Sequence, residues 1–225
     1  DEIRFGDNDR IAALVAHLVE AEALILLTDT AGLLTADPRR NTEASLIEEI
    51  LEIDQEMEQL AGGTGTDRGS GGMASKLAAA KIASWSGVRT VIADASRVGV
   101  LVDACGDIPG VGTVIRARAG RLGARRLWIA FAGGSSGRIT VDAGARQALE
   151  ERRVSLLPAG VVAATGEFDA GDSVELEDLD GEVFAKGIAR YDVETLRQNL
   201  GRRTTELPEG VSHEVVHADD LVVLP

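Results

Sequence analysis

Cysteine is nearly absent from the sequence, which contains Cys105 and no other thiol. An internal disulfide and a zinc site built from cysteines are therefore excluded, and we expect a protein of the reducing cytoplasm. Aromatic residues make up only 3% of the chain and apolar residues 44%, so any core must consist mainly of Ala, Val, Leu and Ile. No apolar run approaches the length of a membrane span, which predicts that no helix crosses a bilayer.

Positive charge is also scarce, because 23 Lys and Arg residues face 37 Asp and Glu residues and the net charge is −14. Such a chain repels phosphate on average, which argues against nonspecific binding to nucleic acid or to an anionic membrane. A local basic site stays compatible with this charge. Lysine is the rarer cation, with only Lys76, Lys81 and Lys186, so each lysine is a candidate for a specific role.

The first half of the chain alternates between helical and strand-like segments. The periodicity predicts helices at residues 9–21, 46–60, 73–85 and 99–105. Continuous apolar runs predict buried strands at residues 23–27, 90–96 and 112–115. This alternation is typical of an α/β layer with parallel strands.

The pattern changes near Arg116, where a basic, glycine-containing stretch is typical of a linker. Beyond it, short apolar segments predict strands at residues 127–131, 137–141, 160–168 and 172–191, with one helix at residues 143–152. Short strands separated by Gly-Asp, Asp-Gly and Gly-Glu steps favour a small β-barrel. We therefore expect two domains, residues 1–122 and residues 123–225, with a linker strand at the start of the second.

A glycine-rich segment, residues 62–72, precedes the helix expected at residues 73–85, and Lys76 lies in the first turn of that helix. A flexible linker is one interpretation. The segment matches neither GxxxxGK[ST], because Ser75 stands directly before the lysine, nor GxGxxG, which should follow a strand. A helix N-terminus nevertheless offers free N–H groups and positive partial charge, where a lysine is unfavourable until an anion binds. The second interpretation is a phosphate-binding loop of a non-Walker type.

Two further polar clusters have both a structural and a functional interpretation. The stretch FGDND, residues 5–9, offers helix caps, but a cap explains only one polar residue, and the others could bind an ammonium group or orient a lysine. Thr28 and Asp29 end an apolar strand, where ligands bind in open α/β sheets or where an ordinary turn begins. Lys81 is expected to be a solvated helix residue. His213 and His217 are expected to be surface residues, not metal ligands.

Three segments together resemble those of the glutamate 5-kinases, a branch of the amino-acid kinase family: FGDNDRIAALVA, LILLTDTAGLLTADPR and GSGGMASKLAAAKIA. The β-rich remainder resembles the PUA domain of these enzymes, so the resemblance covers essentially the whole chain. It implies an αβα sandwich followed by a PUA β-barrel. It also implies ATP-dependent phosphorylation of the γ-carboxylate of L-glutamate to L-glutamyl 5-phosphate, the first step of proline biosynthesis. Relatives that phosphorylate aspartate, acetylglutamate or uridylate fit FGDND and the β-rich tail less well.

The resemblance assigns roles to individual residues. Asn8 should bind glutamate, Asp9 should orient the catalytic lysines, and Lys76 should stabilise charge on the transferred phosphoryl group. The nucleotide contacts that it implies are Thr28, Asp29, Ser70, Gly71, Gly72, Met73, Ala74, Ser75 and Lys76. ATP with Mg²⁺ is the expected phosphoryl donor, and no residue is assigned as a metal ligand. A homo-oligomer, and proline as a feedback inhibitor, are further expectations of the family.

The sequence also departs from the family pattern. The kinase domain of the family begins with a glycine-rich loop, a further catalytic lysine, and a serine and an aspartate that hold glutamate, and these are not among the 225 residues. Because Asp1 is not Met, we expect a fragment that lacks about the first half of the kinase domain. If that part is not made, no kinase activity is predicted; if it was only cleaved from a longer protein, the function of the family is expected.

The alternative function is a truncated, inactive fragment whose PUA domain binds RNA or a protein. From Gly123 onward, 11 basic residues face 18 acidic ones, and phosphate contacts would have to overcome this charge. We therefore favour a structural, oligomer-supporting or regulatory role for this domain over RNA binding.

Overall fold

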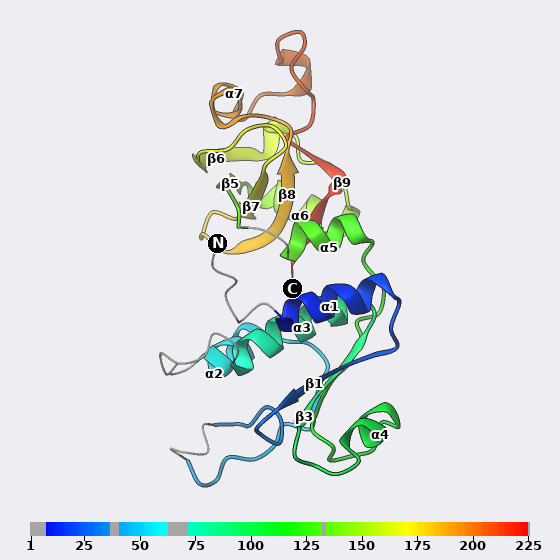
Figure 1. Ribbon diagram of the computed structural model, residues 1–225. Helices are drawn as coiled ribbons and strands as arrows, with labels where there is room; N and C mark the ends of the chain where they lie inside the picture. Colours follow the sequence, from blue (N-terminus) through cyan, green and yellow to red (C-terminus); the bar gives the residue numbers. More distant parts are fainter. Residues whose placement is uncertain (1–7, 37–40, 63–71, 132–133, 225) are drawn as a thin grey trace, which may run out of the picture. The chain divides into compact units, whose positions relative to one another are not determined.

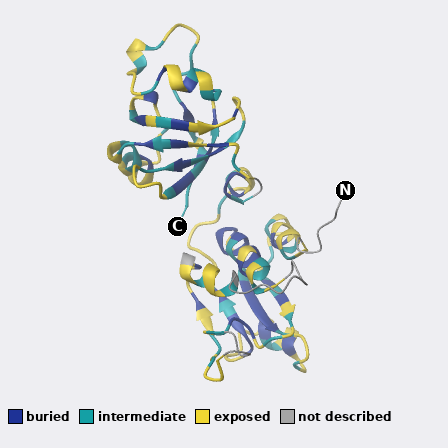
Figure 2. Ribbon diagram, turned by 90° about the vertical axis from the view of Figure 1, so that its left-hand side faces the viewer, coloured by how far each residue is buried: buried dark blue, intermediate teal, exposed yellow. Residues whose placement is uncertain are grey.

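The computed structural model describes residues 8–36, 41–62, 72–131 and 134–224. The chain divides into two compact units, Asp1–Ala124 and Arg125–Pro225, and each unit is built around its own sheet (Figure 1). In both units the buried residues lie mainly along the strands and on the helix faces that cover them (Figure 2). Within the described ranges, no helix combines the length and apolar character needed to cross a membrane.

The first unit forms a four-stranded mixed sheet covered by helices. Its elements are α1 (Asn8–Leu18), β1 (Ala23–Thr28), β2 (Glu49–Ile50), α2 (Gln55–Gly62), α3 (Met73–Trp85), β3 (Arg89–Asp94), α4 (Val100–Cys105) and β4 (Thr113–Ile115). The strand order is β1-β3-β4-β2. β1 and β3 are parallel as predicted, but β4 runs antiparallel to β3. The expectation of parallel strands therefore holds for β1–β3 and for β2–β4 and is wrong for β3–β4.

Most elements expected in this unit are present, and helix α3 has the predicted bounds. The helix expected at residues 46–60 is wrong in its first half, because Glu49–Ile50 forms β2 and α2 begins only at Gln55. Tertiary pairing decides this segment: the Arg116 N–H donates to the Ile50 carbonyl oxygen at 2.9 Å, and the Ile50 side chain is only 1% exposed. An acidic helical pattern is a weak preference that such burial overrides.

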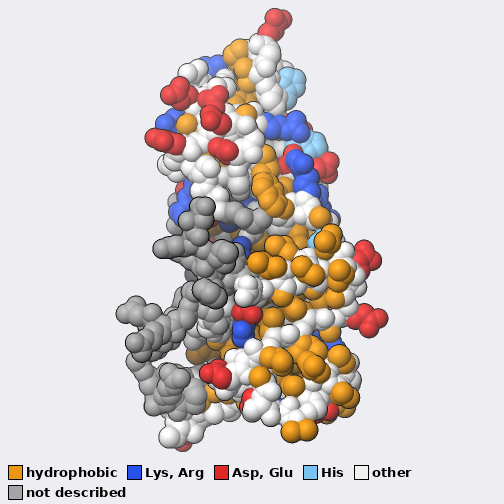
Figure 3. All heavy atoms as spheres, in the orientation of Figure 1, with side chains coloured by type: hydrophobic (Ala, Val, Ile, Leu, Met, Phe, Trp, Pro, Cys, Tyr) orange, Lys and Arg blue, Asp and Glu red, His pale blue; other side chains and the backbone are white. Residues whose placement is uncertain are grey.

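Helices cover both faces of the central strands. α1 and α3 pack against each other and against β1 and β3, while α4 contacts the same two strands (Figure 1). Val91, Ile92 and Ala93 of β3 are fully buried as a result. The side of α1 that faces away from this packing is apolar and exposed, and Figure 3 shows hydrophobic side chains gathered over this helix. Its exposed apolar residues are Ile11, Leu14, Val15 and Leu18.

The second unit consists mainly of a five-stranded sheet. Its elements are α5 (Ala124–Phe131), which begins at the unit boundary, β5 (Gly137–Val141), α6 (Ala143–Arg152), β6 (Val161–Gly166), β7 (Ser173–Glu177), β8 (Val183–Ala189), α7 (Val193–Gln198) and β9 (Val216–Val223), with short 3-10 turns at Pro158–Gly160 and Thr204–Glu206. The strand order is β6-β5-β7-β8-β9. Among the described residues no pair of strands closes this order, so the barrel stays a prediction.

One strand expected in this unit is wrong. Residues 127–131 belong to helix α5, which buries Leu127, Ile129 and Ala130 and leaves Trp128 half exposed. A short apolar run does not distinguish a buried strand from a buried helix face. The helix α6 and the strands β5 to β8 agree with the prediction. Their inward side chains form one core, which includes Ile139, Val174 and Leu176.

Candidate functional site

The first turns of α1 and α3 meet at an ion pair between Asp9 and Lys76. Lys76 Nζ lies 3.2 Å from Oδ1 and 3.0 Å from Oδ2 of Asp9. The two side chains are only 12% and 19% exposed, respectively. The Ser75 hydroxyl also donates to Asp9 Oδ2, at 2.8 Å. Two of the residues to which the resemblance assigns catalytic roles are therefore brought together, although 67 positions separate them in the sequence.

The packing of α1 on α3 explains why the two residues meet. The buried residues of α1 include Ala13 and Ala16, which are 0% and 5% exposed, and those of α3 include Ala79 and Ala80, both fully buried. Side chains this small allow two helices to approach closely. Because α1 begins at Asn8 and α3 at Met73, close packing brings Asp9 and Lys76 to the same end of the helix pair.

The N-terminus of α3 has no cap from its own N-cap residue. Gly72 is the N-cap, and no side-chain hydrogen bond caps this end of the helix. A Cβ placed on Gly72 would meet no atom of the described residues within 4 Å, so none of these residues crowds the N-cap position. The first N–H groups of a helix lack partners within the helix and carry positive partial charge. This end of α3 can therefore accept an anion.

Electrostatics favour the same interpretation. Lys76 adds a full positive charge at the positive end of α3, and this placement costs about 0.3–1 kcal/mol when nothing compensates it. Asp9 compensates part of that charge, and it lies in the first turn of its own helix, where a carboxylate is favourable. A phosphate that binds beside Lys76 would satisfy the remaining positive charge and the free N–H groups together.

Thr28 and Asp29 lie at the carboxyl end of β1, as predicted. The Thr28 hydroxyl donates to Asp29 Oδ1 at 3.3 Å, and the Thr28 carbonyl oxygen accepts the Ala95 N–H at 2.8 Å. Asp29 is exposed. Between the described residues, no hydrogen bond or ion pair joins this strand end to Asp9 or Lys76. The two groups are separate parts of the candidate site.

Asp94 was missed by the sequence reasoning. It ends β3 and is the register partner of Thr28, so it lies at the same edge of the sheet. The backbone N–H of Ser96 donates to Asp94 Oδ1 at 2.7 Å, and this bond holds the pKa of Asp94 below its usual range. The signal was available, because Asp94 follows an apolar strand in the same way that Asp29 does.

The remaining predicted residues that the structure describes lie in the first turns of α1 and α3. Asn8 is exposed and begins α1, directly before Asp9. Met73 is partly buried and Ala74 is exposed in the first turn of α3. Ser70 and Gly71 lie outside the described residues. Their assignment as nucleotide contacts stays a prediction.

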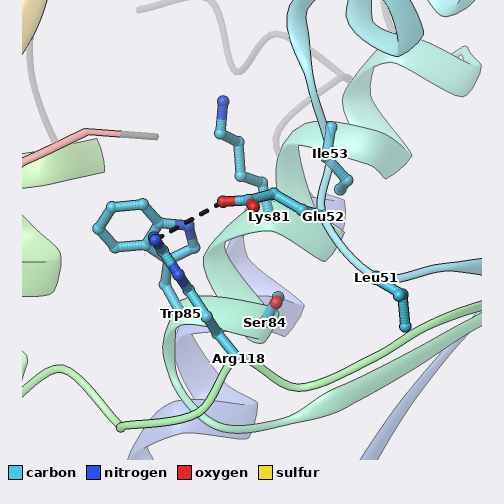
Figure 4. Close-up of a pocket in the computed structure, with 7 residues that line it drawn as sticks. All are labelled: Leu51, Glu52, Ile53, Lys81, Ser84, Trp85 and Arg118. Carbon is cyan, nitrogen blue, oxygen red and sulfur yellow. Dashed lines mark ion pairs between the residues drawn. The ribbon is translucent and has the colours of Figure 1, made fainter.

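Lys81 differs from the expectation of a solvated residue. Its Nζ lies 2.7 Å from Glu58 Oε1 of α2, and its side chain is 23% exposed. It also lines a shallow pocket near the end of α3, where Arg118 lies over the Trp85 ring at 4.4 Å and pairs with Glu52 at 3.6 Å (Figure 4). This pocket lies away from the first turn of α3. Because Lys81 pairs with Glu58, we assign it a structural role.

No group of three or more His, Cys, Asp or Glu residues that could hold a metal ion occurs in the described part of the chain. His217 lies in strand β9, where its ring approaches Glu214 and Asp219 at 3.9 and 3.7 Å. A histidine pair four residues apart on a helix, which would favour a metal site, is thus not formed.

Each of the two structural units contains a segment that matches a known protein family. The amino acid kinase family matches residues 1–94, and the PUA domain matches residues 137–211. The glutamate 5-kinase of Mycobacterium tuberculosis (strain ATCC 25177 / H37Ra) is 46% identical over all 225 residues, which cover 58% of that protein. The glutamate 5-kinase of Mycobacterium avium (strain 104) is 45% identical over the same residues, which cover 60% of it. The chain thus spans less than two thirds of these curated relatives.

Solved structures resemble each unit only loosely. A UMP kinase from Bacillus anthracis is 19% identical with a TM-score of 0.38, over 51% of this chain and 42% of the other. A PUA domain from Aeropyrum pernix K1 is 25% identical with a TM-score of 0.30, over 41% of this chain and 48% of the other. Neither shape is close enough to support an argument about the site. The sequence matches agree with the predicted fold class: residues 1–94 match the amino acid kinase family, residues 137–211 match the PUA domain, and the whole chain is similar to part of the glutamate 5-kinases.

Proposed function

We propose that the chain provides the nucleotide-phosphate end and one catalytic lysine of a glutamate 5-kinase. The observation that carries the proposal is the ion pair of Lys76 with Asp9, at 3.0 Å, beside the uncapped N-terminus of α3. The names of the relatives point to phosphorylation of glutamate at position 5, and the resemblance implies that ATP donates its γ-phosphoryl group to the γ-carboxylate of L-glutamate.

In this reaction a carboxylate oxygen of glutamate bonds to the γ-phosphorus while the bond from that phosphorus to the β–γ bridging oxygen breaks. Catalysis of such a transfer depends on positioning and on neutralising charge. The phosphates would lie against the first N–H groups of α3, and Lys76 would neutralise charge on the transferred group. Asp9 would hold the lysine in place through its two short contacts. Asn8, exposed beside Asp9, would contact glutamate.

The residues present fit the phosphates of ATP better than they fit a protein-bound metal. The open, uncapped end of α3 suits an anion, whereas the Asp9 carboxylate is already engaged by Lys76 and Ser75. Mg²⁺ usually binds through substrate phosphates and one or two carboxylates. We therefore infer that Mg²⁺ would arrive with the nucleotide and neutralise phosphate charge there. Thr28 and Asp29 would contact the nucleotide from the end of β1.

A hydroxamate-trapping assay tests this proposal. L-Glutamyl 5-phosphate, trapped as the hydroxamate, is measured for the purified chain and for Lys76→Ala, and the intact mass is determined for each. At a mass larger than that of these 225 residues, we expect hydroxamate formation that disappears in Lys76→Ala; at the mass of the 225 residues alone, we expect none. Lys81→Ala is the matched control, because Lys81 is a cation of the same helix that pairs with Glu58. Full activity in Lys76→Ala would refute the assignment of the lysine.

Nucleotide binding is measured separately, because it does not require the whole kinase. Titration with Mg²⁺-ATP by calorimetry should show binding that is weakened in Lys76→Ala and unchanged in Lys81→Ala. Binding without turnover, at the mass of these 225 residues, would show that the nucleotide end is present and that turnover needs more chain. Homo-oligomer formation, feedback by proline and the role of the PUA domain stay predictions of the same proposal.

A further inference from the structure

The hydroxyl of Ser75 contacts the candidate site through Asp9. Ser75 Oγ lies 2.8 Å from Asp9 Oδ2 and 2.9 Å from the Gly72 carbonyl oxygen. Lys76 Nζ lies 3.0 Å from the same Oδ2. Two consecutive residues in the first turn of α3 thus hold one carboxylate of α1.

A hydroxyl has only one proton to donate, so the two acceptors compete for it. The Gly72 carbonyl oxygen already accepts the backbone N–H groups of Ser75 at 3.1 Å and Lys76 at 3.4 Å. A bond from a hydroxyl to an ionised carboxylate is stronger than one to a neutral carbonyl. The Ser75 hydroxyl therefore donates mainly to Asp9 Oδ2, and this hydrogen bond is the one relevant to the site.

The two donors differ in how firmly they hold Asp9. The Lys76 ammonium is attached through a flexible four-carbon stem, whereas the Ser75 hydroxyl is one carbon from the helix backbone. A short side chain on a packed helix fixes the position of its acceptor more narrowly than a long one does. The carboxylate orientation that lets both oxygens of Asp9 face Lys76, at 3.2 and 3.0 Å, therefore depends on Ser75.

We propose that Ser75 is a positioning residue: its hydroxyl fixes the Asp9 carboxylate and thereby holds the Lys76 ammonium at the open end of α3. The proposal rests on the proposed function for its catalytic meaning, since Lys76 is the group that would meet the phosphoryl group. The resemblance implies a nucleotide contact for Ser75, whereas the geometry engages its hydroxyl proton with Asp9.

Lysine labelling tests the positioning without any activity. The chain contains only three lysines, so limiting acetic anhydride followed by peptide mass spectrometry reports on each one. Lys81 and Lys186 are internal references, because both have their own carboxylate partners. In Ser75→Ala the ion pair of Lys76 should open more often, and its labelling should rise several-fold relative to the references. Ser75→Thr keeps the hydroxyl and should restore the wild-type rate.

Ser86→Ala is the matched control. Ser86 closes the same helix and donates its hydroxyl to the Ile82 carbonyl oxygen at 2.8 Å, so the variant removes an equivalent hydroxyl with no bond to Asp9. Circular dichroism checks that each variant keeps its helical content. Wild-type labelling of Lys76 in folded Ser75→Ala, or a rise in Ser86→Ala as large as in Ser75→Ala, would overturn the proposal.

Kinetics separate positioning from nucleotide contact. If the chain forms glutamyl phosphate, Ser75→Ala should lower kcat about 10-fold, as loss of a hydrogen bond to a charged group predicts, with little change in the KM for ATP. A raised KM for ATP at unchanged kcat would instead make Ser75 a nucleotide contact and overturn the proposal. If the wild-type chain is inactive, the proposed function fails at this length of chain, while the labelling result still decides the role of Ser75.

Discussion

The ion pair of Asp9 with Lys76 should contribute measurably to the stability of the first unit, and its two halves should not be equivalent. Removing one partner of a fully buried pair costs 3–5 kcal/mol, and removing one partner of an exposed pair costs less than about 1 kcal/mol. With side chains that are 12% and 19% exposed, this pair lies between those limits. We expect a coupling free energy of about 1–3 kcal/mol in a double-mutant cycle.

The asymmetry follows from what each variant leaves behind. Asp9→Ala leaves an ammonium at the positive end of α3 with no carboxylate beside it, which is unfavourable. Lys76→Met leaves a carboxylate that still accepts the Ser75 hydroxyl at 2.8 Å and lies in the first turn of its own helix. Asp9→Ala should therefore lower the free energy of unfolding more than Lys76→Met does, by about 1 kcal/mol.

Urea unfolding, followed by tryptophan fluorescence, measures the difference in the free energy of unfolding between the two variants for the first structural unit. Trp85 is 6% exposed in α3, whereas Trp128 is 55% exposed in α5, so a Trp128→Phe background isolates the signal of the first unit. The cycle uses Asp9→Ala, Lys76→Met and the double variant. A coupling free energy below about 0.5 kcal/mol, within the usual limit of additivity, would show that the pair does not form. If Asp9→Ala and Lys76→Met lowered the free energy of unfolding equally, the argument from charge at the helix N-termini would be refuted.

Three further predictions concern packing and charge. Gly112→Ala should prevent folding of the first unit, seen as lost Trp85 burial, because a Cβ there would lie 2.2 Å from the Ile92 carbonyl oxygen. Leu176→Ala, at a position with no exposed surface, should lower the free energy of unfolding of the second unit by about 2–5 kcal/mol in urea. The backbone N–H of Glu182 holds the pKa of Asp178 below its usual 3.8. The stability that Asp178 contributes is thus present above pH 3.8 and is lost as the pH falls through the lower folded-state pKa. An acid titration by circular dichroism should therefore show a shallower loss in Asp178→Asn than in the wild type.

Each of these variants has a control nearby. Gly123→Ala places its Cβ where no described atom lies within 4 Å, so it should fold normally. Leu179→Ala removes a side chain that is 64% exposed and should change stability by less than about 0.5 kcal/mol. The structure would be contradicted if Gly112→Ala folded, or if Leu176→Ala lowered the free energy of unfolding no more than Leu179→Ala does. It would also be contradicted if the wild type and Asp178→Asn lost stability equally steeply at acid pH.

Local pattern was sufficient wherever neighbouring residues determine the element. Helix α3 has its predicted bounds because a glycine precedes it and an apolar, alanine-rich run continues it to Trp85. Strands β1 and β3 were recognised as continuous apolar runs, and both are buried in the sheet. The phosphate-loop interpretation depends on local facts alone, namely glycines, a helix start and a lysine in its first turn, and it stays a prediction.

Long-range pairing decided what the pattern could not. Glu49–Ile50 became a strand because its backbone pairs with β4, and residues 127–131 became part of helix α5, in which the buried Leu127 and Ala130 are three residues apart and share a face. β4 runs antiparallel to β3, a direction that residue types do not encode. In each case the secondary structure of the segment depends on the backbone or core residues, distant in sequence, against which it packs. The intrinsic helix or strand propensity of a short apolar or acidic run is too weak to override this packing.

The sequence by itself carried the resemblance to glutamate 5-kinases and the prediction that Lys76 meets a phosphate, because the three motifs and the order of helices and strands are properties of the linear chain. Only the tertiary structure decided that Asp9 meets both Ser75 and Lys76. Asp9 lies 67 positions from Lys76, and the contact exists because small side chains let α1 and α3 pack with their first turns together. Hydrogen bonds between side chains form only within about 3.5 Å, and packing alone brings such distant residues that close.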